Sequence, residues 1–250
     1  MILSRIARAL KDQSWLAVGI EFVIVILGVV IGFQVTAWNA DRAEQDVITR
    51  QLHEVRDDIR ADITAIELTR DASLWRLAAA EYLLTEANDG AGLRSMSTAP
   101  GGTVDATLLP IVTEADLPML LARVNLIRGV TGRRTGYQSL VNGGSLRLIE
   151  AGELRSSIQR YYAGYDDFQR NLNTFRDIRS AALPVLFEHG FSLFSDHDID
   201  TVLDAARNNP AFLAYLRTSR ETGQFQTASI LAREDEARAL LALINAELDE

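Results

Sequence analysis

The stretch WLAVGIEFVIVILGVVIGFQVTAW, residues 15–38, contains only two strongly polar side chains, Glu21 and Gln34. A helix rises about 1.5 Å per residue, so a helix over this stretch is long enough to cross a hydrocarbon core about 30 Å thick. A tryptophan stands at each end, and tryptophan rings favour the headgroup region of a bilayer. The stretch therefore predicts one transmembrane helix surrounded by membrane lipid. The residues expected at its two interfaces are Trp15, Trp38 and Asn39.

A cleaved signal peptide is the competing interpretation of this segment, because it too begins with basic residues and an apolar run. The exit from the run reads TAWNA, residues 36–40, which lacks a small-x-small cleavage pattern. We therefore expect an uncleaved anchor. Residues 1–14 carry three basic residues and the 15 residues after Trp38 carry two. Because positive charge favours the cytoplasmic side, this small excess predicts residues 1–14 inside the cytoplasm and residues 39–250 outside it.

The body of the chain is acidic and lacks several reactive side chains. Three of the 25 basic and two of the 34 acidic residues precede residue 40, which leaves the body a formal charge of −10. Such a surface repels phosphate backbones, so nucleic acid is not an expected partner. The chain has no cysteine, and Lys11 is its one lysine. Thiol nucleophiles, cysteine-ligated metals, P-loop lysines and Schiff bases are therefore excluded from the body, and we expect no cofactor.

Helical periodicity without strand alternation runs through the body and predicts an all-α fold. Residues 40–88 contain no proline and no glycine, and they predict a long helix continuous with the membrane span. A loop rich in glycine, serine, threonine and proline follows. The expected elements are a long helix over about 40–88, a loop over 88–112, short helices over 113–142, a long helix over about 152–189, and helices over about 196–216 and 222–248.

Two of the predicted helices carry apolar stripes at heptad spacing. The stripe of the first helix has one irregular step, whereas that of the second repeats steps of four and three from Leu154 to Phe175. Neither stripe is stable in water alone, so we expect the two to pack antiparallel as a bundle or coiled-coil-like core. The residues expected in this core are Ile59, Ile63, Tyr161, Tyr165, Phe168, Leu172 and Phe175.

Glu21 lies roughly 9 Å inside the inner end of the span by helical rise, and an ionisable residue at that depth is a functional candidate. Gly28 and Gly32 share its helix face and form a small-xxx-small pattern, which lets two helices approach closely. This pattern favours a contact with a second copy of the chain or with a partner's transmembrane helix. The alternative is a glutamate that reaches the interface and glycines that are merely common in membrane helices. The residues assigned to the contact are Glu21, Gly28, Gly32 and Gln34.

Capping explains a polar cluster that resembles a metal site. Residues 196–200 read DHDID, but a calcium loop needs glycine at its sixth position and glutamate at its twelfth, where this chain has Thr201 and Arg207. Helix N-terminal capping boxes need Ser or Thr followed three residues later by an acid. The chain has two such pairs, Ser195 with Asp198 and Thr113 with Asp116.

No group of side chains in the body has the spacing of a catalytic or metal site. His53 and His189 are isolated, with no second histidine at helical spacing. A basic patch between Arg123 and Arg134 is expected to pair with acidic helices of the same chain. We therefore expect no catalytic residue and no metal ligand.

The membrane segment resembles the domain-of-unknown-function family 6090, bacterial single-pass membrane proteins whose span reads Gly-Glu, a glycine, a small residue, a glutamine and Trp-Asn. This chain departs from that pattern where Gly32 replaces the usual alanine and where Ile20 separates Gly19 from Glu21. A second match lies between Tyr137 and Tyr162, so the resemblance covers about half of the chain. It implies an anchor in a bacterial inner membrane, a helical body in the periplasm, and no assigned activity. The matching positions in the span are Glu21, Gly28, Gly32, Gln34, Trp38 and Asn39.

Three functions compete on these grounds. The first is a non-enzymatic interaction or scaffold protein tethered to the membrane. The second is an ectodomain that binds a ligand and signals through a membrane partner, because the 14 residues inside are too few for an output domain. The third and least supported is a membrane-anchored hydrolase, since no nucleophile–base pair is visible. A pocket with convergent polar groups would favour the second or third, and a solid bundle would favour the first.

Overall fold

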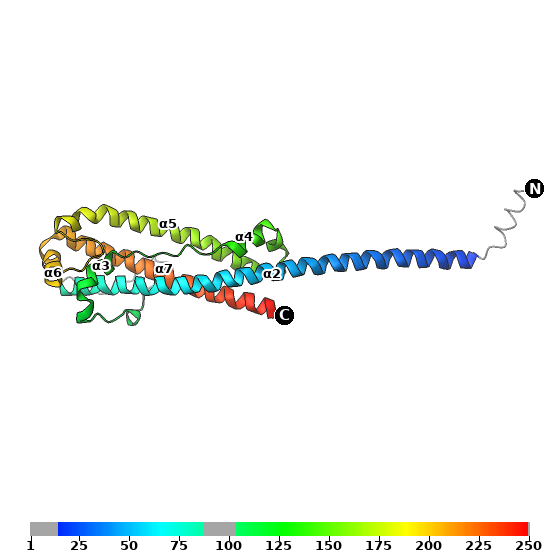
Figure 1. Ribbon diagram of the computed structural model, residues 1–250, viewed down its shortest axis with the longest axis horizontal. Helices are drawn as coiled ribbons and strands as arrows, with labels where there is room; N and C mark the ends of the chain where they lie inside the picture. Colours follow the sequence, from blue (N-terminus) through cyan, green and yellow to red (C-terminus); the bar gives the residue numbers. More distant parts are fainter. Residues whose placement is uncertain (1–14, 88–103, 250) are drawn as a thin grey trace, which may run out of the picture. The chain divides into compact units, whose positions relative to one another are not determined.

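The computed structural model describes residues 15–87 and 104–249, with side chains from residue 18 onward. The described residues are mostly helical and contain no strand, which confirms the all-α prediction (Figure 1). The expected cytoplasmic segment, residues 1–14, and most of the expected loop, residues 88–103, lie outside this part. The chain divides into two units, Met1–Arg50 and Gln51–Glu250.

Helix α2, Trp15–Glu86, is continuous over 72 residues. It contains no proline, and no glycine follows Gly32 within it, so no residue after that point favours a break. The prediction that the apolar segment and the first long helix form one continuous helix is confirmed. In the first unit the apolar side chains of the span are exposed, and α2 is long and apolar enough to cross a membrane.

Short helices follow residue 103. They are η1 (Ala106–Leu108), η2 (Glu114–Met119), α3 (Leu120–Asn125), α4 (Thr135–Asn142) and η3 (Ser145–Leu148). The predicted capping box at Thr113 is present, because the Thr113 backbone N–H donates to the Asp116 carboxylate at 3.0 Å. The helix that it starts is 3₁₀ before it becomes α3. Pro118 lies in that 3₁₀ turn, where it avoids the clash that its ring makes inside an α-helix.

The second half of the chain forms α5 (Gly152–Glu188), α6 (Ile199–Asn208) and α7 (Pro210–Asp249). The predicted long helix over 152–189 is confirmed, and it ends just before Gly190, whose φ of 73° is left-handed. The cap predicted at Ser195 is wrong. Asp198 is the N-cap of α6, and its carboxylate accepts the Thr201 backbone N–H at 3.0 Å.

The predicted break between residues 216 and 222 is also wrong, because α7 continues through it. This polar stretch contains no proline, and part of it is buried within the bundle rather than exposed in a turn. Ser219 and Arg220 are both buried, and Nη1 of Arg220 lies 3.9 Å from Oε2 of Glu81 on α2. Tertiary contacts therefore keep in helical form a segment whose local pattern suggested a loop.

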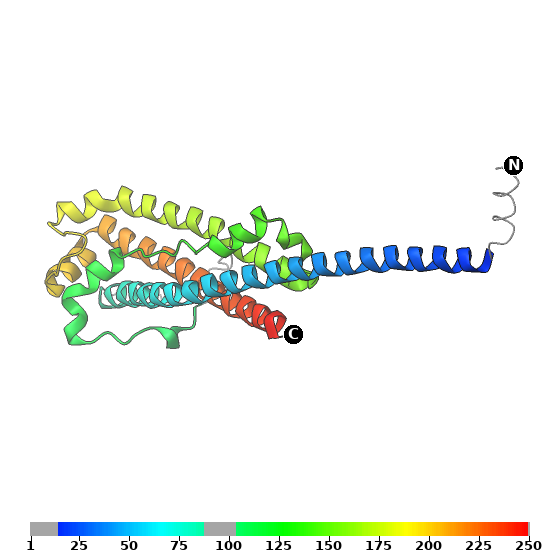
Figure 2. The same cartoon turned by 45° about the vertical axis from the view of Figure 1, so that its right-hand side comes forward.

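Within the second unit, α5 runs parallel to α2, and α7 runs antiparallel to both (Figures 1 and 2). Asp62 of α2 meets Tyr161 of α5, and further along both helices Arg76 and Arg179 line one groove. The expected antiparallel pairing of the two seams is therefore wrong in direction. Residues 126–134 carry the chain back along the bundle, so α5 starts again from the same end as this part of α2. Pairs that show the opposite direction of α2 and α7 are Glu67 with Arg238, Arg70 with Glu234, and Glu81 with Arg220.

The expected core residues are mostly buried. Phe175 is the exception, since it is half-buried and its ring centroid lies 5.5 Å from that of Phe225 on α7. A third long helix thus shares the apolar stripe of α5, which the two-seam prediction did not include. The buried members of the set are Ile59, Ile63, Tyr161, Tyr165, Phe168 and Leu172.

Candidate anion-binding groove

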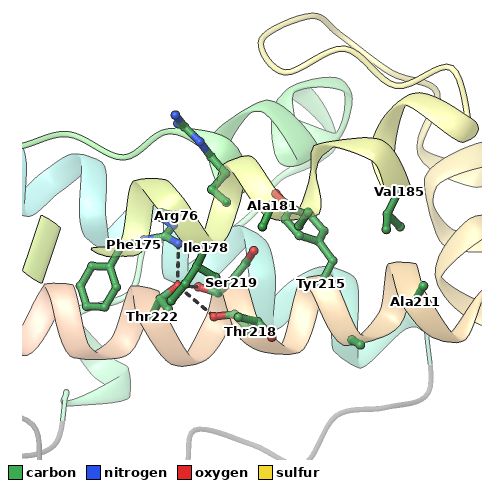
Figure 3. Close-up of a pocket in the computed structure, with 13 residues that line it drawn as sticks. Arg76, Phe175, Ile178, Ala181, Val185, Ala211, Tyr215, Thr218, Ser219 and Thr222 are labelled. Atoms are coloured by element: carbon green, nitrogen blue, oxygen red, sulfur yellow. Dashed lines mark hydrogen bonds between the residues drawn. The ribbon is translucent and has the colours of Figure 1, made fainter. Parts of the chain in front are cut away.

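A groove of about 260 Å³ lies between α5 and α7, with one arginine of α2 in its lining (Figure 3). Its walls combine apolar side chains with hydroxyl groups. The α5 wall includes Phe175, Ile178 and Val185, and the α7 wall includes Tyr215 and Thr222. The groove therefore offers both an apolar surface and hydrogen-bonding groups to a small molecule.

Small side chains keep this groove open. Ala181 and Ala182 line it from α5, and Ala211 and Ala214 line it from α7. Larger side chains at these positions would fill the space between the two helices, as they do elsewhere in a close-packed core. Ala181, Ala211 and Ala214 are also exposed, so the groove opens to solvent on the alanine side.

Arg76 supplies the buried charge of the groove. Its side chain comes from α2, and the residue is only 2% exposed. Nε donates to the Val124 carbonyl oxygen at 3.1 Å, Nη1 to Oε1 of Gln226 at 2.8 Å, and Nη2 to Oγ1 of Thr222 at 2.8 Å. All three acceptors are neutral, so the guanidinium is hydrogen-bonded while its positive charge is not neutralised.

The other buried arginine of the described chain, Arg220, has a carboxylate nearby, as buried arginines usually do. Arg220 is 7% exposed and has the Glu81 carboxylate 3.9 Å away. No ion pair of Arg76 occurs among the described residues, and no Asp or Glu lines the groove. Burial, with a smaller contribution from the nearby charge of Arg179, lowers the pKa of Arg76 to about 10, and Tyr215 opposes that shift. Arg76 is therefore still a cation at neutral pH, although its charge is costly to bury.

The C-terminal end of α3 explains how the arginines are held. Free carbonyl groups at a helix C-terminus accept hydrogen bonds and carry a partial negative charge. The Val124 carbonyl accepts from Arg76, and the Asn125 carbonyl accepts from Nη1 of Arg179 at 2.9 Å. The Asn125 side chain also accepts from the Tyr215 hydroxyl at 2.5 Å. A helix end supplies only about half an elementary charge, so two arginines leave an excess of positive charge.

The groove is suited to binding rather than to catalysis. It is lined by hydroxyl groups of Thr218, Ser219 and Thr222 but by no histidine or carboxylate that would activate them as nucleophiles. In the part of the chain that the structure describes, no group of three or more histidine, aspartate or glutamate side chains is placed to hold a metal ion. The chemistry on offer is therefore electrostatic and apolar recognition.

A second hollow, of about 410 Å³, lies where α4, η3 and α5 meet, and it also contains two arginines. Its Arg147 is exposed and hence hydrated, so its charge needs no partner. Arg155 donates to the Ile149 carbonyl oxygen at 3.0 Å and is half-buried. Neither arginine bears the desolvation cost that distinguishes Arg76.

The residues predicted for the membrane span lie together on α2 in the first unit. A Cβ added at Gly28 or Gly32 would meet nothing within 4 Å, so both positions are open for a neighbouring helix. Trp38 is 60% exposed and lies 5.7 Å below the guanidinium of Arg42. Glu21, Gln34 and Asn39 are exposed. Trp15 begins α2, and its side chain lies outside the described part.

Sequence reasoning missed two buried aspartates beside the tyrosines of α5. Oδ2 of Asp62 accepts from the Tyr161 hydroxyl at 3.0 Å, and that hydroxyl lies 3.1 Å from the hydroxyl of Tyr165. One helical turn earlier, Oδ2 of Asp58 accepts the Gly136 backbone N–H at 2.7 Å. These contacts explain why the predicted tyrosines are core residues with satisfied hydroxyls.

Sequence reasoning also missed Arg76. A signal was present, since Arg76 interrupts the run LWRLAAAEYLL, residues 74–84, which is otherwise largely apolar. A charged residue inside such a run indicates either a buried pair or a site. The basic patch between Arg123 and Arg134 was expected to pair with acidic residues of the same chain, and two of its arginines do so. Arg123 pairs with Asp116 at 2.8 Å, and Arg134 pairs with Asp166 at 2.5 Å.

Comparison of the chain with protein-family models, with curated proteins and with solved structures finds no match.

Proposed function

We propose that this protein is a membrane-anchored, non-enzymatic binding protein whose helical body takes up a small organic molecule in the groove between α5 and α7. The span over residues 15–38 anchors it in a bacterial inner membrane, with residues 1–14 in the cytoplasm and the body in the periplasm. The resemblance to domain-of-unknown-function family 6090 agrees with this placement.

The observation that carries the proposal is Arg76, a buried cation without a carboxylate partner at an apolar groove. A pocket with convergent polar groups favours a ligand-binding ectodomain over a solid scaffold. Binding would be reported to the cell through a membrane partner, either a second copy of the chain or another transmembrane helix. Gly28 and Gly32 are the positions proposed for that contact.

The groove is tested by filling it. In full-length protein in nanodiscs, Ala214→Phe places a ring in the groove, whereas Ala242→Phe changes an exposed alanine of the same helix away from it. Ligand-observed NMR with benzene derivatives carrying a carboxylate, an amide or an ammonium group measures binding. We expect Ala214→Phe to abolish binding that Ala242→Phe retains. If no probe binds the wild-type protein, or if Ala214→Phe has no effect, the proposal fails.

The anchor is tested by membrane fractionation. High salt and alkaline carbonate remove peripheral proteins, so the anchored chain is expected to stay in the membrane pellet. Release of a soluble chain that starts near Ala40 would show cleavage and contradict the anchor.

An interaction or scaffold role is the second proposal, and exposed aromatic side chains favour it. Phe187 near the end of α5 is 56% exposed, and Phe194 in the following connection is 60% exposed. A double change to serine at these positions should weaken association with a protein partner and leave the groove intact. A partner complex that tolerates this change but is lost in Ala214→Phe would assign the association to the groove instead.

A further inference from the structure

We propose that the groove takes a monocarboxylate that carries one compact apolar group, an inference that rests on the binding function proposed above. The carboxylate faces Arg76, and the apolar group lies between the alanine-rich walls of α5 and α7.

The charge of the ligand follows from the surroundings of Arg76. A guanidinium has five N–H groups, and the three hydrogen bonds of Arg76 leave one N–H on Nη1 and one on Nη2 without an acceptor among the described residues. Two N–H groups of one guanidinium match the two oxygens of a carboxylate. The Thr218 hydroxyl also lines the groove and adds a further donor, whereas the Thr222 hydroxyl already donates to the Thr218 carbonyl oxygen at 2.8 Å. An anion therefore gains both an ion pair and hydrogen bonds, whereas a cation would be repelled.

The single charge follows from the rest of the chain. The protein has a formal net charge of −9, and a long-range field of that sign disfavours a multiply charged anion. Within the groove, Arg76 is the one cation that is buried, while Arg179 is half-buried and already donates to the Asn125 carbonyl oxygen. One negative charge matches one buried positive charge.

The size of the ligand follows from the volume of about 260 Å³. A dry cavity of about 150 Å³ holds a benzene molecule, and pockets for drug-sized ligands begin at about 300 Å³. The groove therefore fits a single ring or a short branched chain together with its carboxylate. Phe175, Ile178 and Val185 supply the apolar contact for that group.

Three probes of similar shape test the chemical class by titration calorimetry on full-length protein in nanodiscs at pH 7. They are 3-phenylpropionate, its neutral amide 3-phenylpropanamide, and phenyl phosphate. We expect 3-phenylpropionate to bind about tenfold or more tightly than the amide, because the carboxylate forms an ion pair with Arg76 that the neutral amide cannot form. Phenyl phosphate is expected to bind more weakly than 3-phenylpropionate.

Variants locate the charge preference. Arg76→Gln should bring the affinities for 3-phenylpropionate and its amide to within about threefold, since the remaining hydrogen bonds do not distinguish them. Arg220→Gln removes the other buried arginine, which lies outside the groove lining, and should keep the preference. Circular dichroism checks that both variants fold. If Arg76→Gln does not fold, the comparison of the three probes on wild-type protein decides.

The outcomes separate this inference from the binding function itself. Equal binding of acid and amide, both lost in Ala214→Phe, would overturn the carboxylate class and leave the groove as a binding site. Tighter binding of phenyl phosphate would also overturn it, in favour of a phosphorylated ligand. Binding of none of the probes would overturn both proposals.

Discussion

The hydroxyl of Tyr161 donates to Oδ2 of Asp62 across 3.0 Å and so joins α5 to α2 between residues 99 positions apart. The other oxygen of this carboxylate accepts the backbone N–H of Arg133 at 2.8 Å. Asp58, one turn away, holds the Gly136 N–H in the first turn of α4, a helix whose own N-cap residue makes no side-chain cap bond. Two aspartates of α2 thus fix where the returning chain meets the bundle.

Removal of the Tyr161 hydroxyl is expected to destabilise the fold. Tyr161→Phe leaves a buried carboxylate oxygen without its donor, which costs about 1–3 kcal/mol. Tyr82→Phe is the control, because Tyr82 is partly buried and its hydroxyl makes no hydrogen bond in the described structure. Denaturant unfolding of the full-length protein in nanodiscs measures both. Equal losses in the two variants would show that the Asp62 bond contributes nothing.

Asp62 is expected to make stability depend on pH. Burial raises the pKa of its carboxyl group, with the hydrogen bonds of Arg133 and Tyr161 opposing that shift. Because the folded-state pKa is raised, the stability that the protonated Asp62 carboxyl contributes is complete below the unfolded pKa, about 3.9. This stability is lost as the pH rises through the folded-state pKa. The difference in melting temperature between wild type and Asp62→Asn should therefore fall with rising pH and then level off. Asp57→Asn, an exposed change on the same helix, should show no such trend.

Phe168 is expected to be a stability determinant of α5. It is 6% exposed, and Phe168→Ala should cost about 3–5 kcal/mol, the usual cost of emptying an aromatic core site. Phe187→Ala removes the same atoms from an exposed position of the same helix and should change stability by about 0.5 kcal/mol or less. Thermal melts followed by circular dichroism compare the two. An unchanged melting temperature for Phe168→Ala would contradict the packing of α5 in the bundle.

Gly136 is expected to resist a methyl group although it lies in a helix. A Cβ there would lie 2.6 Å from the carbonyl carbon of Glu54 and closer still to the backbone nitrogen of Val55, so α4 and α2 would have to move apart. Gly136→Ala should therefore lose about 1–3 kcal/mol despite the better helix propensity of alanine. Gly152→Ala meets nothing within 4 Å and should leave stability unchanged or raise it. A stabilising Gly136→Ala would disprove the close approach.

The glycines of the span are expected to govern association in the membrane. Gly28→Ile places a branched side chain where two backbones would approach, so it should weaken association of the full-length chain in bilayers. Val29→Ile, at an exposed neighbouring position, is the control. Energy transfer between labelled copies of the chain in bilayers measures self-association. The same measurement after addition of a membrane extract detects a partner that competes for this face. An undiminished signal for Gly28→Ile in both settings would rule out this face.

Local sequence patterns were enough to predict the long helices. Apolar spacing and the lack of proline and glycine act within a few turns, so most of α2 and the bounds of α5 were predictable. The break expected before Thr222 is absent, because buried contacts keep that part of α7 helical. The cap expected at Ser195 is absent, because the carboxylate of Asp198 caps α6 instead.

Tertiary structure alone decided the direction of the helices and the groove. The same two apolar stripes allow parallel or antiparallel packing, and the return of the chain over residues 126–134 selects the parallel arrangement of α2 and α5. Arg76 becomes a buried cation only because Val124, Thr222 and Gln226, which lie 48 to 150 positions away, surround it with neutral acceptors. Burial and charge balance depend on neighbours that are distant in the chain, so the apolar run around Arg76 can mark this residue but cannot show which groups surround it.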